Sequence, residues 1–343
     1  MNVRRLMAAM EGLAVSRALL PAPAPPTVEE ALGSGALLLE QAGVETARLD
    51  AECLLGHVLG VPRWHLTMEP DRRLHGEEFA AYLRMLQRRE EREPLAYLLG
   101  GREFWSLPLL VSRDVLVPRP ETETLVEAAL AVARGGGPLL LGPRAPGPEP
   151  RAAGAPPAAS SLLLVDLCTG SGAIAIALAR ELPTSTVLAT DISWRALRVA
   201  RANAAAQGVA SRVSFLRGGG WRPAAEALKG KQADLVTVNP PYVRSGLIPG
   251  LMPEVRWEPR QALDGGPDGL VIIREVVAGA PRHLRAGGVL LLEIGADQGE
   301  QVRELVEASD AFDAWRVLPD LAGRDRVVVA RRSDTERERQ PEP

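Results

Sequence analysis

The stretch that decides the fold runs from Leu162 to Ala173 and reads LLLVDLCTGSGA. Its first half, Leu162 to Leu167, is a continuous apolar run, which is typical of a central parallel strand because such a strand is buried on both faces. Its second half is a glycine turn that opens a predicted helix, Ile174 to Glu181. Glycines let the backbone approach a ligand closely, and a helix N-terminus offers unpaired N–H groups. The spacing G-x-G fits a nucleotide-type ligand but falls short of the full dinucleotide fingerprint.

An acid follows the next predicted strand, which runs from Thr186 to Asp191. Asp191 lies about 20 residues after the glycines, where a carboxylate meets ribose hydroxyls in nucleotide sites. The same side chain can instead cap the predicted helix from Trp194 to Gln207. The order of strand, glycine turn, helix, strand and acid favours the ribose contact.

A third feature is the turn Asn239-Pro240-Pro241-Tyr242, which closes the apolar run from Ala233 to Val238. Two successive prolines cannot donate to a ladder, so this strand must stop at the sheet edge, where open α/β sheets bind ligands. The Asn239 amide oxygen and the prolyl carbonyls are acceptors, and Tyr242 adds an aromatic face. This set suits a planar NH2 group. A Pro-Pro turn with a capping Asn is the alternative interpretation.

The remaining carboxyl-terminal pattern continues to alternate between strands and helices. A strand from Val213 to Arg217 leads into Gly218-Gly219-Gly220-Trp221, where Trp221 either stacks an adenine or lies in the core. A polar loop reaches Asp268, and the predicted elements after it are helices 270–284 and 300–308 and strands 289–294, 315–318 and 326–330. This order predicts an α/β fold with a doubly wound, mostly parallel sheet.

The amino-terminal part has a helical pattern instead. Thr27-Val28-Glu29-Glu30 is a capping box, and residues 27–93 predict a small helical bundle that docks a partner, with Arg88 to Glu93 as a solvated face. Residues 94–133 predict a β-hairpin, with strands 103–111 and 114–117, and a connecting helix. Arg119, held between two prolines, is a candidate to bind a ligand carboxylate.

Three segments are predicted to lie outside the folded domains. Residues 134–161 hold six Gly and seven Pro in 28 positions, so we expect a flexible insertion. Residues 1–26 are expected to be a disordered extension or to follow a start codon placed too early, with an export signal as the minor alternative. Residues 332–343 predict a disordered tail, and residues 162–331 then form the catalytic domain.

The composition of the 343-residue chain limits its partners. A net charge of −3 disfavours duplex DNA or RNA as the main partner, and no apolar run is long enough for a membrane span. Cys53 and Cys168 lie in separate segments and fit a reducing cytoplasm. The four histidines, His57, His65, His75 and His283, show no metal-ligand spacing, so no metal site is expected.

The glycine turn, Asp191 and the Asn239 turn together resemble a class I S-adenosylmethionine-dependent methyltransferase. The segments LAYLLGGREFW (95–105), VPRPETE (117–123), 254–270 and LAGRDRVVVAR (321–331) narrow the resemblance to the release-factor glutamine methyltransferase, or PrmC/HemK, family. This resemblance implies a seven-stranded Rossmann-like sheet and a protein that methylates N5 of the glutamine in the GGQ motif of peptide chain release factors. It also implies a cytoplasmic enzyme, which we expect to be a monomer.

The resemblance also assigns roles to residues. It implies that Thr169, Gly170, Ser171, Gly172 and Ala173 hold the methionine side of S-adenosylmethionine, that Asp191 holds its ribose, and that Trp221 holds its adenine edge. Asn239, Pro240, Pro241 and Tyr242 would grip the substrate amide, with Asn239, Pro240 and Tyr242 as the catalytic residues. Asn239 and Arg119 would also contact the cofactor. The family usually carries an acid before the aromatic at Trp221, whereas this chain has Gly220, so the adenine amine is expected to lose one acceptor.

Other functions are compatible with parts of the pattern. A sister family modifies a ribosomal-protein glutamine, although it has a serine where this chain has Pro120. A DNA or RNA adenine methyltransferase would use the same acceptors for an exocyclic amine, but the net charge disfavours it. A binding module without chemistry is a further alternative. A nicotinamide-dependent dehydrogenase is the most distant alternative, because the third glycine of the fingerprint is missing.

Overall fold

The structure, a computed structural model, describes residues 25–136 and 161–334. They divide into two compact units: residues up to Gly100 together with Met252–Trp257, and residues Gly101–Leu251 together with those from Glu258 onward. The expectations for residues 1–26, 134–161 and 332–343 lie largely outside the described part of the chain. In that part, no helix is long and apolar enough to cross a bilayer.

The first unit is helical, as its sequence predicts. The predicted capping box is present, because the Thr27 hydroxyl accepts from Glu30 N and the Glu30 carboxylate accepts from Thr27 N. Buried leucines and Tyr82 form the core. The helices are α2 (Val28–Gln41), α3 (Ala47–Leu59), α4 (Arg63–Met68), α5 (Gly76–Glu90) and α6 (Leu95–Leu99).

The prediction of a fully solvated face from Arg88 to Glu93 is wrong. Arg89 is buried and forms ion pairs with Asp50 at 2.7 Å and with Glu254 at 2.9 Å, and Glu93 is buried as well. A guanidinium with five donors can be buried when carboxylates surround it. These pairs explain why residues 252–257, distant in sequence, belong to the helical unit.

The hairpin lies earlier in the chain than predicted. Its strands are β1 (Gly101–Phe104) and β2 (Leu107–Leu110), and residues 114–117 form no strand. The turn residues Trp105 and Ser106 both have positive φ, which the sequence does not suggest. Trp105 is held there because its backbone N–H donates to Glu123 and its indole N–H donates to Glu181.

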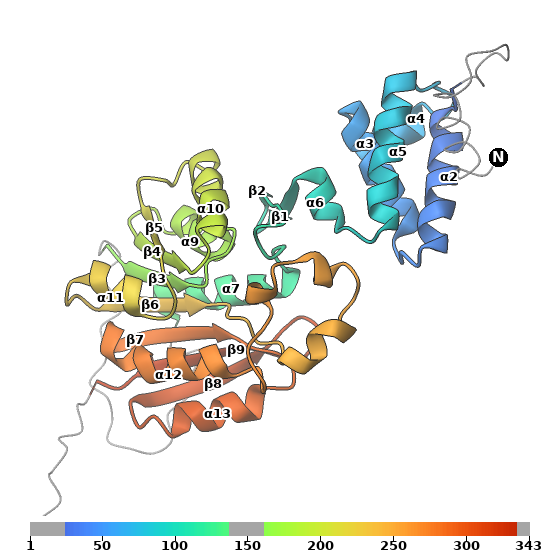
Figure 1. Cartoon of the computed structure of the whole chain (residues 1–343). Helices are drawn as coiled ribbons and strands as arrows, with labels where there is room; N and C mark the ends of the chain where they lie inside the picture. The colour runs from blue at the N-terminus through green and yellow to red at the C-terminus, as the bar shows by residue number, and fades with distance from the viewer. Residues whose placement is uncertain (1–24, 137–160, 335–343) are drawn as a thin grey trace, which may run out of the picture. The chain divides into compact units, whose positions relative to one another are not determined.

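The second unit contains a seven-stranded sheet in the order β5-β4-β3-β6-β7-β9-β8 (Figure 1). The first five strands in this order are parallel, and β9 is antiparallel to both of its neighbours. The chain moves outward from β3 to β5 and then returns to β6 on the other side of β3. The strands are β3 (Leu163–Leu167), β4 (Thr186–Asp191), β5 (Val213–Arg217), β6 (Ala233–Val238), β7 (Leu284–Glu293), β8 (Phe312–Pro319) and β9 (Asp325–Arg332).

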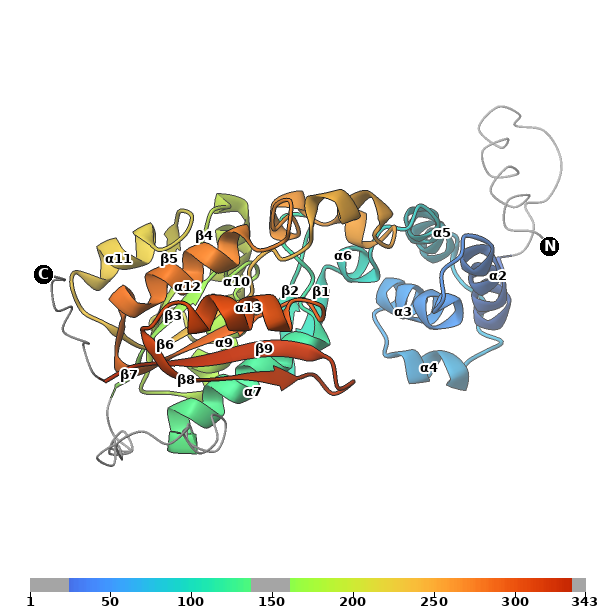
Figure 2. The same cartoon turned by 90° about the horizontal axis from the view of Figure 1, so that it is seen from below.

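Helices cover both faces of this sheet (Figure 2). They are α7 (Glu123–Ala131), α9 (Ala173–Glu181), α10 (Trp194–Ala206), α11 (Arg222–Leu228), α12 (Val271–His283) and α13 (Gly299–Glu307). Of these, α11 was not predicted. The observed architecture confirms the predicted doubly wound, mostly parallel α/β fold.

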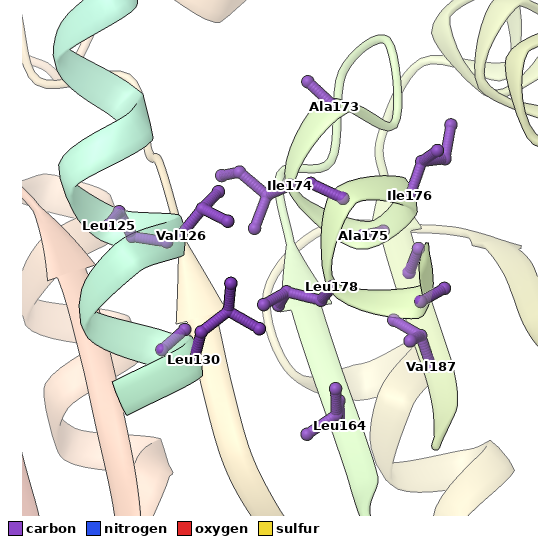
Figure 3. Packing of buried hydrophobic residues seen from close by; sticks show 14 of the residues in the cluster. Leu125, Val126, Leu130, Leu164, Ala173, Ile174, Ala175, Ile176, Leu178 and Val187 are labelled. Carbon is purple, nitrogen blue, oxygen red and sulfur yellow. The ribbon is translucent and has the colours of Figure 1, made fainter. Parts of the chain in front are cut away.

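Alternate residues of each strand supply two separate cores. Leu164 of β3 packs with α7 and α9, whereas its neighbour Val165 packs with α11 and α12. Figure 3 shows the first core, in which Val126 of α7 lies toward Ile174 of α9, with Leu164 below them. Since strand side chains alternate between faces, a strand buried on both faces must be apolar throughout. This burial fixes the strand ends that carry the site.

Candidate active site

A cavity of about 300 Å³ opens at the carboxyl ends of β3, β4 and β6. This is the place where the order of parallel strands reverses, and open α/β sheets bind ligands there. The cavity brings together most of the predicted site residues. Its lining includes Cys168, Thr169, Gly170, Ser171, Ala173, Asp191, Arg119, Asn239, Pro241 and the glycines 218–220.

The glycine turn leaves open space for a ligand. Gly170 has φ +55°, and a Cβ built on it would meet no atom within 4 Å. Gly172 is different: at φ +83° its Cβ would lie 2.9 Å from Ile176 and 3.1 Å from Ala200. Gly172 thus permits the close approach of α9 and α10, while Gly170 keeps the backbone accessible to a ligand.

Asp191 joins the glycine turn to the start of α10. Its Oδ2 accepts from Gly170 N at 2.9 Å, and its Oδ1 accepts from Ser193 N at 2.8 Å. Burial raises the pKa of Asp191, and these two backbone donors act in the opposite direction. A carboxylate oxygen has two lone pairs and can accept a second hydrogen bond. Asp191 can therefore hold the turn and still accept a ligand hydroxyl at the cavity wall.

Asp166 lies beneath the same turn and is fully buried. Its Oδ1 accepts from the Thr237 hydroxyl at 2.8 Å, which links β3 to β6. Burial raises the pKa of Asp166 to about 6, and the Thr237 donor limits this rise. The carboxyl thus braces the two strands whose ends carry the glycine turn and Asn239.

Asn239 presents its amide at the cavity wall. Its Nδ2 donates to the Thr122 hydroxyl at 3.3 Å. Among the described residues, neither Asn239 Oδ1 nor the Pro240 carbonyl accepts a hydrogen bond. Pro240 is buried behind the cavity wall, and Pro241 lines it. Within the described residues, Asn239 Oδ1 is therefore an unused acceptor at the cavity wall, and the Pro240 carbonyl is an unused acceptor next to it in the chain.

A glycine loop supports this turn from behind. A Cβ on Gly265 would lie 2.7 Å from the Pro241 carbonyl oxygen, and one on Gly269 would lie 2.4 Å from the Tyr242 carbonyl oxygen. The side-chain amide of Gln298 donates to the carbonyls of Tyr242 and Gly269 at 3.0 and 3.3 Å. Only glycine allows so close an approach. The loop therefore fixes the turn without covering its acceptors.

Tyr242 lies apart from the cavity lining, unlike the predicted stacking face. Its ring packs in the second core, and its hydroxyl donates to Glu293 Oε1 at 3.4 Å. Burial raises the pKa of the Tyr242 hydroxyl above its ordinary value. Burial likewise raises the pKa of Glu293 to about 7, against the opposing effects of Thr122 and Arg326.

Arg119 lines the cavity but already has a carboxylate partner. It forms an ion pair with Glu258 at 2.6 Å, and Glu258 also accepts from Val117 N at 3.3 Å. Burial raises the pKa of Glu258, whereas the Arg119 guanidinium acts to lower it. Arg119 thus ties residues 117–119 to the loop after residue 257.

Trp221 lies in the core. Its indole N–H donates to the Val276 carbonyl at 3.2 Å, and its ring stacks on His283 at 4.7 Å. These contacts favour the core interpretation, and Trp221 is absent from the cavity lining. Gly220 does line the cavity. Because glycine has no side chain, the space beside it can hold a carboxylate from another part of the chain. A Cβ on Gly220 would lie 1.8 Å from Glu275 Oε1, so the Glu275 carboxylate of α12 occupies this space.

Several residues around the site were not predicted from the sequence. They are Thr122, Glu258, Gly265, Gly269, Glu275, Glu293 and Gln298. Glu293 had a detectable signal, because it is an acid that ends a buried strand beside the strand of Asn239. The others approach the site through loops and helix faces, for which strand periodicity gives no signal.

Comparison with known proteins identifies the class of protein to which this fold belongs. The family described as "Methyltransferase small domain" matches residues 157–249. The crystal structure of the hMettl16 catalytic domain in complex with the MAT2A 3′UTR hairpin 6 has the same fold, with a TM-score of 0.51, 13% identity, and coverage of 71% of this chain and 82% of that one. The fold and the site define a Rossmann-like methyltransferase.

Curated relatives along most of the chain narrow this class. A "Release factor glutamine methyltransferase" of Moorella thermoacetica is 42% identical over 90% of this chain and 99% of its own length, and one of Cereibacter sphaeroides is 43% identical over 88% and 97%. The family described as "PrmC N-terminal domain" matches residues 30–100. The chain belongs to the release factor glutamine methyltransferase family.

Proposed function

We propose that this protein transfers a methyl group from S-adenosylmethionine to the side-chain amide nitrogen of a glutamine, the one in the GGQ motif of peptide chain release factors. The observation that carries the proposal is that Asn239 Oδ1, at a cavity shared with the glycine turn, and the carbonyl of the next residue, Pro240, accept no hydrogen bond from the residues that the structure describes. A primary amide has two in-plane N–H groups, which match two acceptors. The names of the curated relatives support this substrate.

The residues of the cavity fit the cofactor. Gly170 leaves space for its methionine portion beside Thr169 and Ser171, and Asp191 offers an acceptor for its ribose hydroxyls. When bound there, S-adenosylmethionine supplies an electrophilic methyl group on a positively charged sulfur. The Asn239 amide is uncharged, so it would leave the positive charge on the sulfur, and the methyl group would stay electrophilic.

The work of the protein is to position a poor nucleophile. An amide nitrogen is weakly nucleophilic because its lone pair is delocalised into the carbonyl. If Asn239 Oδ1 and the Pro240 carbonyl each accept one N–H, the nitrogen is held with its lone pair directed into the cavity. Such positioning supplies up to roughly 7–11 kcal/mol in intramolecular reactions. The chain needs no histidine base, because the methylated nitrogen becomes acidic and releases its proton to water.

Mass spectrometry tests this function directly. A release factor incubated with the protein and S-adenosylmethionine should gain one methyl group, about 14 Da, on the glutamine of its GGQ motif. A release factor with that glutamine changed to alanine is the matched control. Ribosomal proteins and an adenine-containing oligonucleotide serve as competing substrates. Methylation of either one in place of the release factor would overturn the proposal.

Glu275 carries a prediction about cofactor affinity. Its carboxylate lies beside Gly220, which lines the cavity, so we propose that it accepts from the adenine amine in place of the acid that the family usually carries at that position. Glu275→Ala should weaken cofactor binding by about 10-fold to 150-fold, the range for one lost hydrogen bond to a charged acceptor. Isothermal titration calorimetry measures this change. Glu226→Ala, on the exposed face of α11, is the control. Equal affinity of the parent and Glu275→Ala would remove Glu275 from the site.

A further inference from the structure

The Thr122 hydroxyl does not cap the helix that it precedes, α7. Thr122 is the N-cap residue of α7, where a threonine side chain usually accepts from the helix backbone, yet it makes no such bond. It is 4% exposed and accepts from Asn239 Nδ2 instead. A hydroxyl that accepts in this way still has its own hydrogen to donate. If the Thr122 hydroxyl accepts from Asn239, the NH2 group of the Asn239 amide faces Thr122; if it donates, the amide oxygen faces Thr122.

Glu293 is a buried carboxylate with one oxygen that no described residue uses. It ends β7, the strand next to β6, and is 1% exposed. Its Oε1 accepts from Tyr242, and no residue in the ranges 25–136 and 161–334 donates to its Oε2. The Thr122 hydroxyl acts to lower the pKa of this carboxyl, and β7 pairs directly with β6, the strand that Asn239 follows. An unpaired buried carboxylate oxygen is costly, so we expect the Thr122 hydroxyl hydrogen to turn toward Glu293.

We propose that Glu293, acting through Thr122, is the positioning residue that turns the Asn239 amide so that its oxygen faces the substrate. An ionised carboxylate only accepts, so the Thr122 hydroxyl must donate to it and keep its lone pairs for Asn239 Nδ2. Asn239 Oδ1 is then left on the cavity side. Glu293 also holds Tyr242 and thus fixes both ends of the Asn239-Pro240-Pro241-Tyr242 turn. This inference rests on the proposed function.

Protonation of Glu293 removes the requirement that the Thr122 hydroxyl donate to this carboxyl. A neutral carboxyl can donate to Thr122, which can then donate to Asn239 Oδ1 and turn the amide so that its NH2 faces the substrate NH2. Because the pKa of Glu293 is raised to about 7, kcat should fall as the pH drops below neutrality. The groups that also act on this carboxyl are Arg326 of β9, Tyr242, and Glu121 before α7.

The first experiment compares conservative variants. Thr122→Val removes the hydroxyl and keeps the shape, so kcat on a release factor should fall by about 10-fold to 100-fold while the dissociation constant of S-adenosylmethionine changes by less than about 3-fold. Thr122→Ser restores the hydroxyl and should recover most of kcat. Glu293→Gln should lower kcat and flatten its dependence on pH near 7.

Asp234→Asn is the matched control, because Asp234 is a carboxylate at the opposite end of β6 that accepts from Leu163 N and Arg285. It should lower thermal stability and leave the pH profile of kcat unchanged. If Thr122→Val and Glu293→Gln behave like Asp234→Asn, with stability reduced and the pH profile intact, Glu293 is structural and the inference is wrong.

A second measurement separates this inference from the proposed function. The carbon-13 NMR signal of the Glu293 carboxyl, assigned by its loss in Glu293→Gln, should titrate near pH 7 and shift to a higher midpoint in Thr122→Val. This readout needs no substrate. A parent protein that methylates no release factor but shows this titration would contradict the function alone. A titration that Thr122→Val leaves unchanged would contradict the link between Thr122 and Glu293.

Discussion

Replacing Asn239 with alanine should lower methyl transfer to a release factor by about 1,000-fold or more and leave cofactor affinity within about 3-fold of the parent. The loss is large because the alanine removes Oδ1, an acceptor that acts on the reacting nitrogen itself, and misplacing that nitrogen sacrifices the gain from positioning. The cofactor is expected to keep its affinity because the glycine turn and Asp191 lie on other strands.

Calorimetric titration with S-adenosylmethionine, together with transfer of a labelled methyl group, measures both effects. Asn239→Asp is the matched variant, because it keeps an oxygen in the same place, and it should retain more activity than the alanine. Loss of cofactor binding in parallel with turnover would mean that Asn239 serves the cofactor or the fold of the turn. The assignment of Asn239 to the substrate amide would then be wrong.

Replacing Asp191 with alanine should weaken S-adenosylmethionine binding by about 100-fold. Hydrogen bonds to a charged group contribute about 1.5–3 kcal/mol each, and this carboxylate is proposed to hold the ribose. It also accepts from Gly170 and Ser193, so its loss releases the glycine turn and the start of α10. The thermal unfolding midpoint should therefore fall as well.

Asp191→Asn separates the two roles, because the asparagine keeps one oxygen acceptor and replaces the other with an NH2 group. It should bind the cofactor more tightly than Asp191→Ala. For each Asp191 variant, calorimetry measures the affinity for S-adenosylmethionine and thermal unfolding measures the stability, and the two losses are compared. A variant that loses stability and still binds S-adenosylmethionine like the parent would show that Asp191 is only a cap for α10.

Local sequence determined most of the architecture. Short apolar runs such as Leu162 to Leu167, each followed by a turn, are typical of strands buried on both faces, so the parallel sheet could be predicted from them. The hairpin could not be placed, because its turn at Trp105 and Ser106 depends on Glu123 and Glu181 from two helices. The buried state of Arg89 likewise depends on Glu254, which follows it by 165 residues.

The candidate site divides in the same way. The glycine turn, Asp191 and the Asn239 turn could be found because each one ends a predicted strand, and parallel strands bring their carboxyl ends to one edge. Trp221 could not be assigned from the sequence, since an aromatic beside a glycine run fits either a ligand or a core. Its hydrogen bond to the Val276 carbonyl and its stacking on His283 favour the core.

By itself the sequence determined the order of the sheet strands and the residues that end β3, β4 and β6, because backbone chemistry and hydrophobic period act between near neighbours. Only the tertiary structure decided how those residues are held: Thr122 beside Asn239, Glu293 beside Tyr242, and Glu275 in the space left by Gly220. The physical reason is that a buried polar group must find its partner wherever the packed chain provides one, and a partner that is distant along the chain leaves no local pattern in the sequence.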